Sequence, residues 1–436
     1  MNLLVPHDIL KGMEEIKLDI KFMTFKGNGG GRLDGKVIFV PYTVTGDEIL
    51  IRITEDRKNY SIGKLEKILT PSPWRAPPTC PHFGLCGGCH WQHIDPSVHE
   101  VLKRKILEDL LQEMAGLKEI PLLSVVPSAQ PYGYRVRIQL KVEGNKIGFF
   151  EERSHRVIEI DRCPIAHPII NAILQHIQKK PFPFSGVEGI EINVSPEEGK
   201  GILIFHLNLS GQRKNFPLKE LLQSFPLLKG IAVVRKKRWT TLGDPILNVS
   251  TTLKRLGRER VFRLRVSPGS FFQVNLGQNL ELIQTVLDFG EFKGSERVLD
   301  LYAGIGNFTL PLATEAEWVL GIEESKKAVA DARFNAEGNG IKNCQFLSGS
   351  VEGSLKTFGG KSDLILLDPP RMGAKRALDQ IVRLGPRKII YVSCEPTTLS
   401  RDLRLFSERG YSLQKLCLVD MFPQTYHMEV VGLLTH

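Results

Sequence analysis

The stretch Arg297-Val-Leu-Asp-Leu-Tyr-Ala-Gly304-Ile-Gly306-Asn-Phe-Thr-Leu-Pro-Leu-Ala313 decides the fold of the C-terminal part of this 436-residue chain. Its apolar start predicts a buried strand, and its two glycines allow a tight turn at which a ligand can approach the backbone. A second apolar run, Trp318-Val-Leu-Gly-Ile322, leads into Glu323, 19 residues after Gly304. A carboxylate at that spacing can accept both hydroxyl groups of a ribose. The pair of strands therefore predicts a nucleotide-binding unit.

The residues after Gly306 restrict the class of nucleotide ligand that the sequence predicts. A dinucleotide fingerprint would have a third glycine, but Asn307-Phe308-Thr309 stands there. This departure disfavours NAD and FAD and favours a smaller adenosyl ligand, for which S-adenosylmethionine is the natural candidate.

Two further apolar runs end in polar residues. Asp363-Leu-Ile-Leu-Leu367 leads into Asp368-Pro-Pro-Arg371, and Lys388-Ile-Ile-Tyr-Val392 leads into Ser393-Cys394-Glu-Pro396. The proline pair fixes an extended turn that holds Asp368 above the sheet, with a merely structural turn as the alternative. Strand and helix signals alternate over residues 295–436, which predicts an open, Rossmann-like α/β sheet with ligands beyond the carboxyl ends of its strands.

Cys394 is a candidate nucleophile. It lies between a buried strand and a helix that starts near Pro396. The positive end of a helix dipole favours a thiolate, the form of cysteine that attacks electrophiles. The alternative is a small buried thiol that packs under the helix.

Residues 1–72 predict a small β-barrel of OB-like type. Short strands are expected from Leu18, Lys36, Glu48 and Tyr60 onward, and Gly27-Asn-Gly-Gly-Gly31 is expected to form a flexible turn. Pro71-Ser-Pro-Trp-Arg-Ala-Pro-Pro78 is then the clearest linker. Residues 73–265 are expected to form an α+β middle domain, and residues 266–436 the catalytic domain.

Four cysteines predict a metal site. Cys80, Cys86 and Cys89 lie within ten residues beside two glycines, and Cys163 supplies a fourth thiol. Disulfides are disfavoured because the N-terminus shows no secretion signal and the cytosol keeps thiols reduced. Four thiolates suit either zinc or an iron–sulfur cluster, and their spacing does not decide between the two.

The charge distribution points to a polyanionic partner. The chain carries a net charge of +10, and residues 73–265 hold 29 Lys and Arg against 18 Asp and Glu. A basic region beside a nearly neutral catalytic domain fits an enzyme that grips RNA outside its active site. No apolar run is long enough to span a membrane, so we expect a cytoplasmic monomer. The candidate phosphate contacts are Arg235-Lys-Lys-Arg238 and the cluster Lys254, Arg255, Arg258, Arg260, Arg263 and Arg265.

Five motifs carry a family resemblance over nearly the whole chain. The sequence resembles the RNA 5-methyluridine methyltransferases, which include the 23S rRNA and tRNA uridine C5 enzymes. The N-terminal segment resembles the TRAM domain, an RNA-binding module. Ala303 and Glu395 depart from the family pattern, at positions that take no part in bond making. The motifs are Ser270-Phe-Phe-Gln273-Val-Asn275, Asp300-Leu-Tyr-Ala-Gly-Ile-Gly-Asn-Phe-Thr-Leu-Pro, Asp368-Pro-Pro-Arg371, Ser393-Cys394-Glu-Pro and Met421-Phe-Pro-Gln-Thr-Tyr-His-Met-Glu429.

The resemblance implies roles for individual residues. Cys394 would attack carbon 6 of uracil, and Glu429 would remove the proton from carbon 5 after methylation. Burial between Met428 and the following apolar run would raise the pKa of Glu429, although a surface salt bridge is the alternative. The cofactor would be S-adenosylmethionine, contacted by Gln273, Tyr302, Gly304, Glu323 and Asp368. The four cysteines would hold a structural 4Fe-4S cluster, with zinc as the alternative.

Rival functions are weaker. A radical S-adenosylmethionine enzyme would need a Cys-x3-Cys-x2-Cys motif, which is absent. A nonenzymatic RNA-binding iron–sulfur protein would be expected to have lost Cys394, Glu429 or the glycine turn. Methylation of a base amino group also uses an Asp-Pro-Pro turn but needs no cysteine. The expected substrate is 23S rRNA first and tRNA second.

Overall fold

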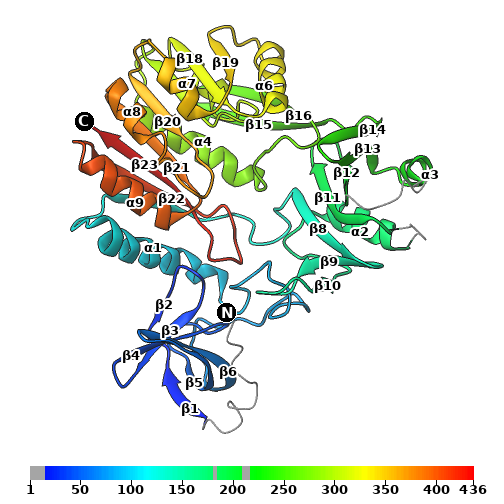
Figure 1. Ribbon diagram of the computed structural model, residues 1–436, viewed down its shortest axis with the longest axis vertical. Helices are drawn as coiled ribbons and strands as arrows, with labels where there is room; N and C mark the ends of the chain where they lie inside the picture. The colour runs from blue at the N-terminus through cyan, green and yellow to red at the C-terminus, as the bar shows by residue number, and fades with distance from the viewer. Residues whose placement is uncertain (1–14, 180–183, 209–216) are drawn as a thin grey trace, which may run out of the picture. The chain divides into compact units, whose positions relative to one another are not determined.

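The computed structural model describes residues 15–179, 184–208 and 217–436 (Figure 1). The chain divides into two compact units. Unit 1 comprises Met1–Leu107 and Pro423–Tyr426, and unit 2 comprises Glu108–Phe422 and His427–His436. Helices of the described ranges are all too short or too polar to cross a membrane.

Unit 2 is built around an eight-stranded sheet in the order β19-β18-β17-β20-β21-β23-β22-β7. The five strands from β19 to β21 are parallel, which is the arrangement expected of a Rossmann-like fold, and β23 runs antiparallel to β21 and β22. The four inner parallel strands are almost wholly buried, as a sheet covered on both faces requires, whereas the edge strand β19 is mostly exposed. The strands are β7 (Leu122–Val126), β17 (Arg297–Leu301), β18 (Trp318–Glu323), β19 (Cys344–Ser348), β20 (Leu364–Leu367), β21 (Lys388–Ser393), β22 (Ser412–Val419) and β23 (Glu429–Thr435).

Helices follow the strands of this sheet. Ser325 and Ser350 cap α6 and α7 by accepting backbone N–H groups of the first turn, as serine at that position commonly does. Pro396 is at the first position of α9, where its missing N–H costs nothing. The helices are α4 (Leu276–Gly290), α5 (Thr309–Leu312), α6 (Lys326–Gly338), α7 (Val351–Thr357), α8 (Leu378–Leu384) and α9 (Pro396–Ser407).

The sheet takes one strand from outside the range expected for the catalytic domain. β7 pairs in parallel with β22, although residues 122–126 were expected in the middle domain. The apolar pattern of a short strand gives no information on its partner, so this long-range pairing could not be read locally. The expected boundary at residue 265 therefore does not account for the whole sheet.

The remainder of unit 2 is a seven-stranded sheet and a hairpin. The sheet order is β10-β9-β8-β11-β12-β13-β14, antiparallel except for β12 with β13, and α2 packs against β11 and β12. This is the expected α+β arrangement. The elements are β8 (Arg137–Glu143), β9 (Lys146–Phe150), β10 (Val157–Glu159), α2 (Pro168–Lys179), β11 (Val187–Ser195), β12 (Lys200–Leu207), α3 (Leu218–Gln223), β13 (Leu228–Arg235), β14 (Arg238–Gly243), and the hairpin strands β15 (Leu247–Arg255) and β16 (Arg258–Val266).

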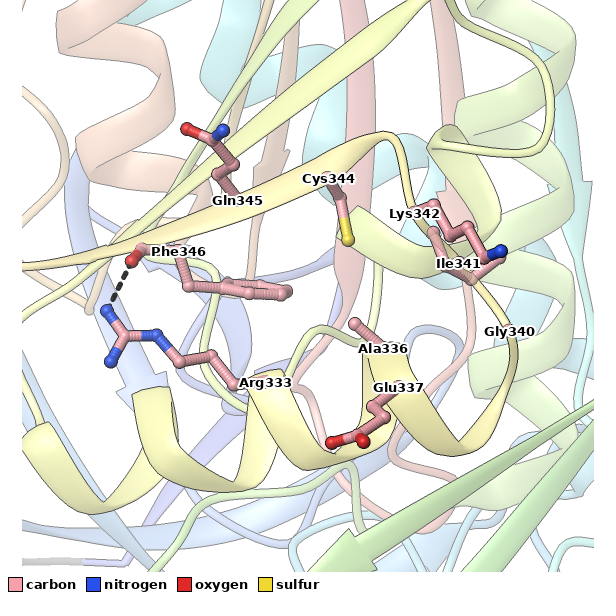
Figure 2. Close-up of a pocket in the computed structure, with 9 residues that line it drawn as sticks. All are labelled: Arg333, Ala336, Glu337, Gly340, Ile341, Lys342, Cys344, Gln345 and Phe346. Atoms are coloured by element: carbon pink, nitrogen blue, oxygen red, sulfur yellow. Dashed lines mark hydrogen bonds between the residues drawn. The ribbon is translucent and has the colours of Figure 1, made fainter.

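A hollow of about 550 Å³ lies between α6 and the edge strand β19 (Figure 2). Arg333 crosses it and donates a hydrogen bond of 2.7 Å to the carbonyl oxygen of Phe346. The other residues that line the hollow are Ala336, Glu337, Gly340, Ile341, Lys342, Cys344 and Gln345. None of them is a candidate site residue.

Unit 1 begins with the expected OB-like fold, a six-stranded sheet in the order β1-β5-β6-β4-β3-β2. Its small core consists of Leu18, Ile20, Ile38, Val40, Ile49 and Ile51. The strands are β1 (Ile16–Asp19), β2 (Phe22–Met23), β3 (Gly29–Leu33), β4 (Lys36–Val40), β5 (Glu48–Asp56) and β6 (Tyr60–Thr70). A 3-10 turn (Pro96–Val98) precedes α1 (His99–Leu110), and a π turn (Leu111–Ala115) follows it.

The glycine run is not a flexible turn. Gly29, Gly30 and Gly31 belong to β3, and the turn ends before them. A Cβ atom on Gly29 would lie 2.2 Å from Thr43 Oγ1, and one on Gly30 would lie 2.3 Å from the ring of Phe22. These glycines are therefore required by close packing, a role that glycine in a strand often has.

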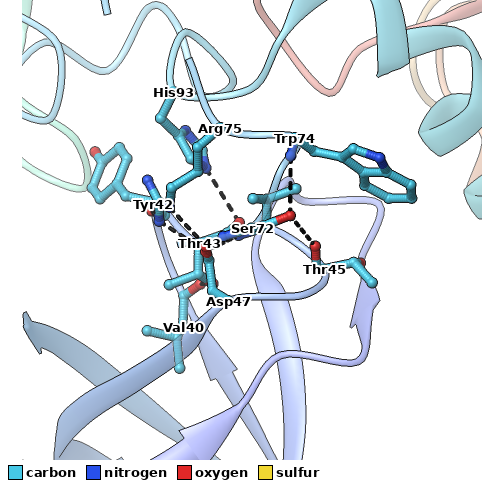
Figure 3. Close-up of polar contacts among 10 residues, drawn as sticks. Val40, Tyr42, Thr43, Thr45, Asp47, Ser72, Trp74, Arg75 and His93 are labelled. Carbon is cyan, nitrogen blue, oxygen red and sulfur yellow. Dashed lines mark hydrogen bonds and ion pairs between the residues drawn. The ribbon is translucent and has the colours of Figure 1, made fainter. Parts of the chain in front are cut away.

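A buried ion pair fastens the expected linker to the barrel (Figure 3). Asp47, almost fully buried, accepts two hydrogen bonds of 2.8 Å from the Arg75 guanidinium and one of 2.9 Å from the Ser72 N–H. His93 bonds the Thr43 carbonyl oxygen at 3.2 Å, and burial lowers the pKa of His93 to about 4. Breaking such a pair by removing one partner typically costs roughly 3–5 kcal/mol. Residues 73–107 are thus grouped with the barrel, and the proline-rich segment is anchored where a linker was expected.

Candidate active site

The expected nucleotide-binding turn is formed in unit 2. One Glu323 carboxylate oxygen accepts the Gly304 N–H at 3.1 Å, and the other accepts the Ser325 N–H at 2.7 Å. Tyr302 and Gly304 both have positive φ, 68° and 55°, so the chain turns sharply after β17. The structure therefore brings three of the predicted cofactor residues together at the carboxyl ends of β17 and β18.

Asp300 is a buried carboxyl group beneath this turn that the sequence analysis did not single out. Thr309, at the start of α5, donates a hydrogen bond of 2.5 Å to it. Burial, and then the neighbouring carboxylates of Asp368 and Glu323, raise the pKa of Asp300 to about 7. A charged residue inside the run Val298-Leu-Asp-Leu301 was the available signal.

The turn after β20 that carries Asp368 is tied to α9. Asp402 on α9 accepts hydrogen bonds from the Tyr391 hydroxyl at 2.8 Å and from the Ala374 N–H at 2.7 Å. Thr398 donates to the carbonyl oxygen of Arg371 at 3.1 Å. The turn thus has a fixed position relative to the helix that follows Cys394. Sequence reasoning missed Asp402, because only the folded chain brings its three partners together.

Cys394 and Glu429 leave the sheet at the same place. β21 and β23 are antiparallel neighbours, and their register pairs Ser393 with Val430. The next residue of one strand is Cys394, and the preceding residue of the other is Glu429. Cys394 is half-buried, and Glu429 is buried. The register therefore places the predicted nucleophile and the predicted base side by side at one end of the sheet.

The surroundings of Cys394 oppose a thiolate. Burial, and then the carboxylates of Glu429 and Asp368, raise the pKa of Cys394 to about 12, while Arg371 acts in the opposite direction. The expectation that the helix dipole yields a thiolate is therefore wrong for the protein without bound substrates. Desolvation and negative neighbours outweigh a dipole effect of typically 0.3–1 kcal/mol.

The two carboxyl groups beside Cys394 are also perturbed. Burial raises the pKa of Asp368 to about 7. Burial and then the charge of Asp368 raise the pKa of Glu429 well above its usual value, in the direction that the sequence predicted. Carboxyl groups with raised pKa values of this kind are common among acid–base groups of active sites.

Gln273 lies on a segment that is fastened at both ends. Asp331 on α6 accepts hydrogen bonds of 2.7 Å from the Ser267 and Ser270 hydroxyls before it. Asn275 after it caps α4 and donates to the Met421 carbonyl oxygen at 3.3 Å. Gln273 itself is buried. The segment thus links α6 to the chain that leads to Glu429.

The predicted metal ligands are distributed over both units. Cys80, Cys86 and Cys89 lie in unit 1 on hydrogen-bonded turns, and Cys163 lies in unit 2, where Asn171 bonds its backbone. Among the residues described, no group of three or more His, Cys, Asp or Glu side chains has metal-site geometry.

The basic residues divide into internal and exposed ones. Arg255 forms ion pairs with Asp288 and Glu315, and Arg265 with Asp331, so these two fasten the β15–β16 hairpin. Lys254 pairs with Glu259 at 3.2 Å. The exposed ones are Lys236, Lys237, Arg238, Lys254, Arg258, Arg260 and Arg263.

A Rossmann-like sheet with an adenosyl-binding turn, joined to an OB-like domain, defines an S-adenosylmethionine-dependent methyltransferase that acts on RNA. Comparison with known proteins is more specific. Residues 99–436 match the tRNA (uracil-5-)-methyltransferase family, and residues 14–65 match the TRAM domain. The chain therefore belongs to the tRNA (uracil-5-)-methyltransferase family.

Relatives match over nearly their full length. An uncharacterised RNA methyltransferase of Aquifex aeolicus is 33% identical over 430 residues, which cover 96% of this chain and 98% of the relative. The 23S rRNA (uracil(1939)-C(5))-methyltransferase RlmD of Pectobacterium atrosepticum is 33% identical over 94% of this chain and 91% of its own. The solved tRNA (uracil-54, C5)-methyltransferase of Pyrococcus abyssi, in complex with S-adenosyl-L-homocysteine, matches 96% of this chain and 99% of its own at 26% identity and a TM-score of 0.75.

We expect the Cys394 thiol to react slowly with iodoacetamide at neutral pH and faster as pH rises toward its pKa of about 12. Replacing Glu429 with Gln removes a carboxyl group whose ionisation opposes ionisation of the thiol, which lowers that pKa and shifts the rate profile to lower pH. The measurement is the alkylation rate of the Cys394 peptide by mass spectrometry between pH 6 and 10. Glu408→Gln, an exposed glutamate that pairs with Arg404, is the control and should leave the profile unchanged. A Cys394 profile that is insensitive to Glu429→Gln would contradict the assigned neighbours.

Proposed function

We propose that this protein methylates carbon 5 of one uridine in 23S rRNA through a covalent bond between Cys394 and carbon 6 of uracil, with Glu429 as the base. The observation that carries this proposal is the register of β21 and β23, which sets Cys394 beside Glu429 at the end of the sheet where Asp368 also lies. A thiol with a buried carboxyl group next to it is what an addition–elimination reaction at adjacent carbons requires.

The chain's residues act in two steps. The Cys394 thiolate adds to carbon 6, which breaks the conjugated enone and makes carbon 5 nucleophilic. When bound, S-adenosylmethionine supplies a methyl group to carbon 5 and is released as S-adenosylhomocysteine. Glu429 then takes the proton from carbon 5, the electrons of that bond restore the double bond between carbons 5 and 6, and the Cys394 thiolate leaves.

The buried carboxyl groups explain how the thiol is kept protonated before the reaction. Because the pKa of Cys394 is raised, the thiol stays unreactive toward other electrophiles. A cationic ligand beside Asp368 would offset the negative charges that raise this pKa and favour the thiolate. The same ligand would be held through the ribose by Glu323, whose carboxylate is already ordered by Gly304 and Ser325. Activation of the nucleophile would thus depend on cofactor binding.

The substrate choice rests on the relatives. A 23S rRNA methyltransferase is 33% identical over most of both chains, which favours 23S rRNA. The match to a tRNA methyltransferase structure over 96% of this chain keeps tRNA as the second candidate.

We expect Cys394→Ala to abolish formation of 5-methyluridine, with a rate loss of at least about a hundredfold, because the addition step has no other nucleophile. The measurement is nucleoside analysis of total RNA, 23S rRNA and tRNA after incubation with methyl-labelled S-adenosylmethionine. Cys344→Ala, a half-buried thiol of the same sheet, is the matched control and should retain activity. Label in a nucleoside other than 5-methyluridine, or full activity of Cys394→Ala, would contradict the proposed chemistry. Label found only in tRNA would identify tRNA, and not 23S rRNA, as the substrate.

Cys80, Cys86, Cys89 and Cys163 are proposed to hold a 4Fe-4S cluster. The donor set fits, because the first three are thiols on consecutive turns whose N–H groups bond within the segment; for example, the Phe83 N–H donates to the Cys80 carbonyl oxygen at 3.1 Å. Four thiolates are the usual ligands of such a cluster and also suit zinc. The cluster's role would be structural, because none of the proposed steps transfers an electron.

We expect protein purified without oxygen to contain iron and acid-labile sulfide in equal amounts, and Cys89→Ser to lose most of both, since a hydroxyl is a poor ligand for this cluster. Elemental analysis and a sulfide assay provide the measurement, and Cys344→Ser serves as the control. Zinc without sulfide would establish the alternative, and neither metal in the wild type would rule out the site.

RNA is proposed to contact the turn between β13 and β14. Lys236, Lys237 and Arg238 are exposed there, and the two lysines have φ of 49° and 64°, which is typical of a tight hairpin turn that projects from a sheet. Exposed cations on a projecting turn can reach phosphate groups without disturbing the fold.

Replacing Arg235, Lys236, Lys237 and Arg238 with Gln is expected to weaken RNA binding and flatten its dependence on salt. Each lost phosphate contact should reduce the slope of log K against log salt by about 0.7–0.9. The measurement is the dissociation constant for RNA at salt concentrations from about 50 to 300 mM. Arg404→Gln with Arg409→Gln, two cations paired with Glu408 and Asp379, is the control. An unchanged slope in the hairpin variant would exclude this surface.

A further inference from the structure

Four residues just before Glu429 are packed into unit 1. Unit 2 resumes at His427, so Pro423–Tyr426, which we call the strap, interrupts it between β22 and β23. Glu429, the first residue of β23, follows the strap by three residues. Only two residues, His427 and Met428, therefore separate Glu429 from a segment that is held by contacts within unit 1.

The cysteine-rich segment holds the strap by its backbone. The carbonyl oxygen of Gln424 accepts hydrogen bonds from the N–H groups of His90 at 3.1 Å and Trp91 at 3.0 Å, directly after Cys89. Gln424 is fully buried, and its φ of 67° is uncommon for a residue with a side chain. Neither atom of its side-chain amide has a hydrogen-bond partner within the described ranges. A buried, strained residue of this kind persists only where its surroundings impose it, and such residues occur often at functional sites.

The barrel holds the strap by its last side chain. The ring of Tyr426 packs edge-on against Phe25, with centroids 5.5 Å apart, and lies 4.6 Å from the ring of His90. Gly27 has a φ of 81°, and a Cβ atom there would lie 3.0 Å from Tyr426 Cδ1 and 3.1 Å from Trp91 Nε1. The turn can close on the strap only because residue 27 is a glycine.

The residues that precede the strap are held by hydrogen bonds within unit 2. The Asp420 N–H donates to the Val126 carbonyl oxygen at 2.9 Å, and the Met421 carbonyl oxygen accepts from Asn275 at 3.3 Å. Glu429 itself pairs with Val419 across β22 and β23. The loop that presents Glu429 is thus fixed at its start by unit 2 and at its middle by unit 1.

We propose that the strap is a positioning element for Glu429, and that Gly27 and Tyr426 act on the reaction by fixing the reach of the base. The proposal rests on the proposed function. It concerns a single step, the removal of the carbon 5 proton, because addition of Cys394 and methyl transfer precede that step. If the base is displaced, the bond between carbon 5 and its proton is not broken, the double bond does not re-form, and Cys394 stays bonded to methylated uracil.

The consequence is a specific signature. A variant that only destabilises the protein, or only weakens RNA binding, lowers addition and release together. A variant that displaces the base slows release and leaves addition in place, so that the methylated enzyme–RNA adduct accumulates. A displacement of about 1 Å can slow a positioned step by about a hundredfold, so a partial displacement should give roughly tenfold.

The experiment compares Gly27→Ala with Gly35→Ala. Gly35 has nearly the same φ, 82°, lies in the same barrel and has no atom within 4 Å of an added Cβ. Both variants carry the same backbone strain, but only Gly27→Ala presses on Tyr426. Tyr426→Ala, which removes the ring without adding an atom, serves as the second variant if Gly27→Ala fails to fold. Circular dichroism and thermal unfolding check the fold of each.

The readout is the fraction of enzyme that carries RNA through denaturing electrophoresis at saturating RNA, with the label on the methyl group of S-adenosylmethionine, together with the rate of 5-methyluridine release. We expect Gly27→Ala and Tyr426→Ala to raise the methyl-labelled adduct and slow release by roughly tenfold. Gly35→Ala should match the wild type, and Glu429→Gln should give the largest amount of adduct.

Each other outcome has a distinct meaning. If Gly27→Ala and Tyr426→Ala lose addition and release in parallel, or behave like Gly35→Ala, while Glu429→Gln still traps the adduct, the positioning role of the strap is wrong. Failure of Glu429→Gln to trap any adduct would instead overturn the proposed function on which the strap proposal rests.

Discussion

Cys394 and Asp368 are half-buried and Glu429 is buried at one end of the same sheet, and the free energy of removing charge from water affects all three. Each carboxylate makes it harder to ionise the next, and both make it harder to ionise the thiol. The resting site is consequently rich in protons and poor in charge. In the proposed reaction, a ligand that brings positive charge next to Asp368 would offset this cost and favour the Cys394 thiolate.

The fixed geometry around these residues is consistent with that constraint. Glu323 is ordered by two backbone N–H groups, Asp300 by Thr309, and the turn after Asp368 by Asp402 on α9. These contacts hold the carboxyl groups so that neither moves into water when its neighbour ionises. A buried polar arrangement retains its effect only while each member stays in place, which is the role of these hydrogen bonds.

Features that depend only on neighbouring residues in the chain could be predicted from the sequence. The strand before Gly304, the separation of 19 residues between Gly304 and Glu323, and the strand before Cys394 all have a local pattern, and the structure contains each of them. The close packing of Gly29–Gly31 and the pairing of β7 with β22 depend on partners far along the chain, so composition alone suggested a turn and a different domain. The thiolate expected at Cys394 failed for the same reason, because the helix start is visible in the sequence, whereas the approach of Glu429 and Asp368 to the thiol is not.

The membership of the strap in unit 1 has a consequence for how the protein is made. A ribosome synthesises the barrel and the cysteine-rich segment first, yet the residues that complete their packing follow about 300 positions later. At roughly 5–20 residues per second, the nascent unit waits tens of seconds with the surface of Gly27, His90 and Trp91 uncovered. Its final packing becomes possible only shortly before Glu429 emerges, so a chain that stops short of the strap lacks both Glu429 and a completed N-terminal unit.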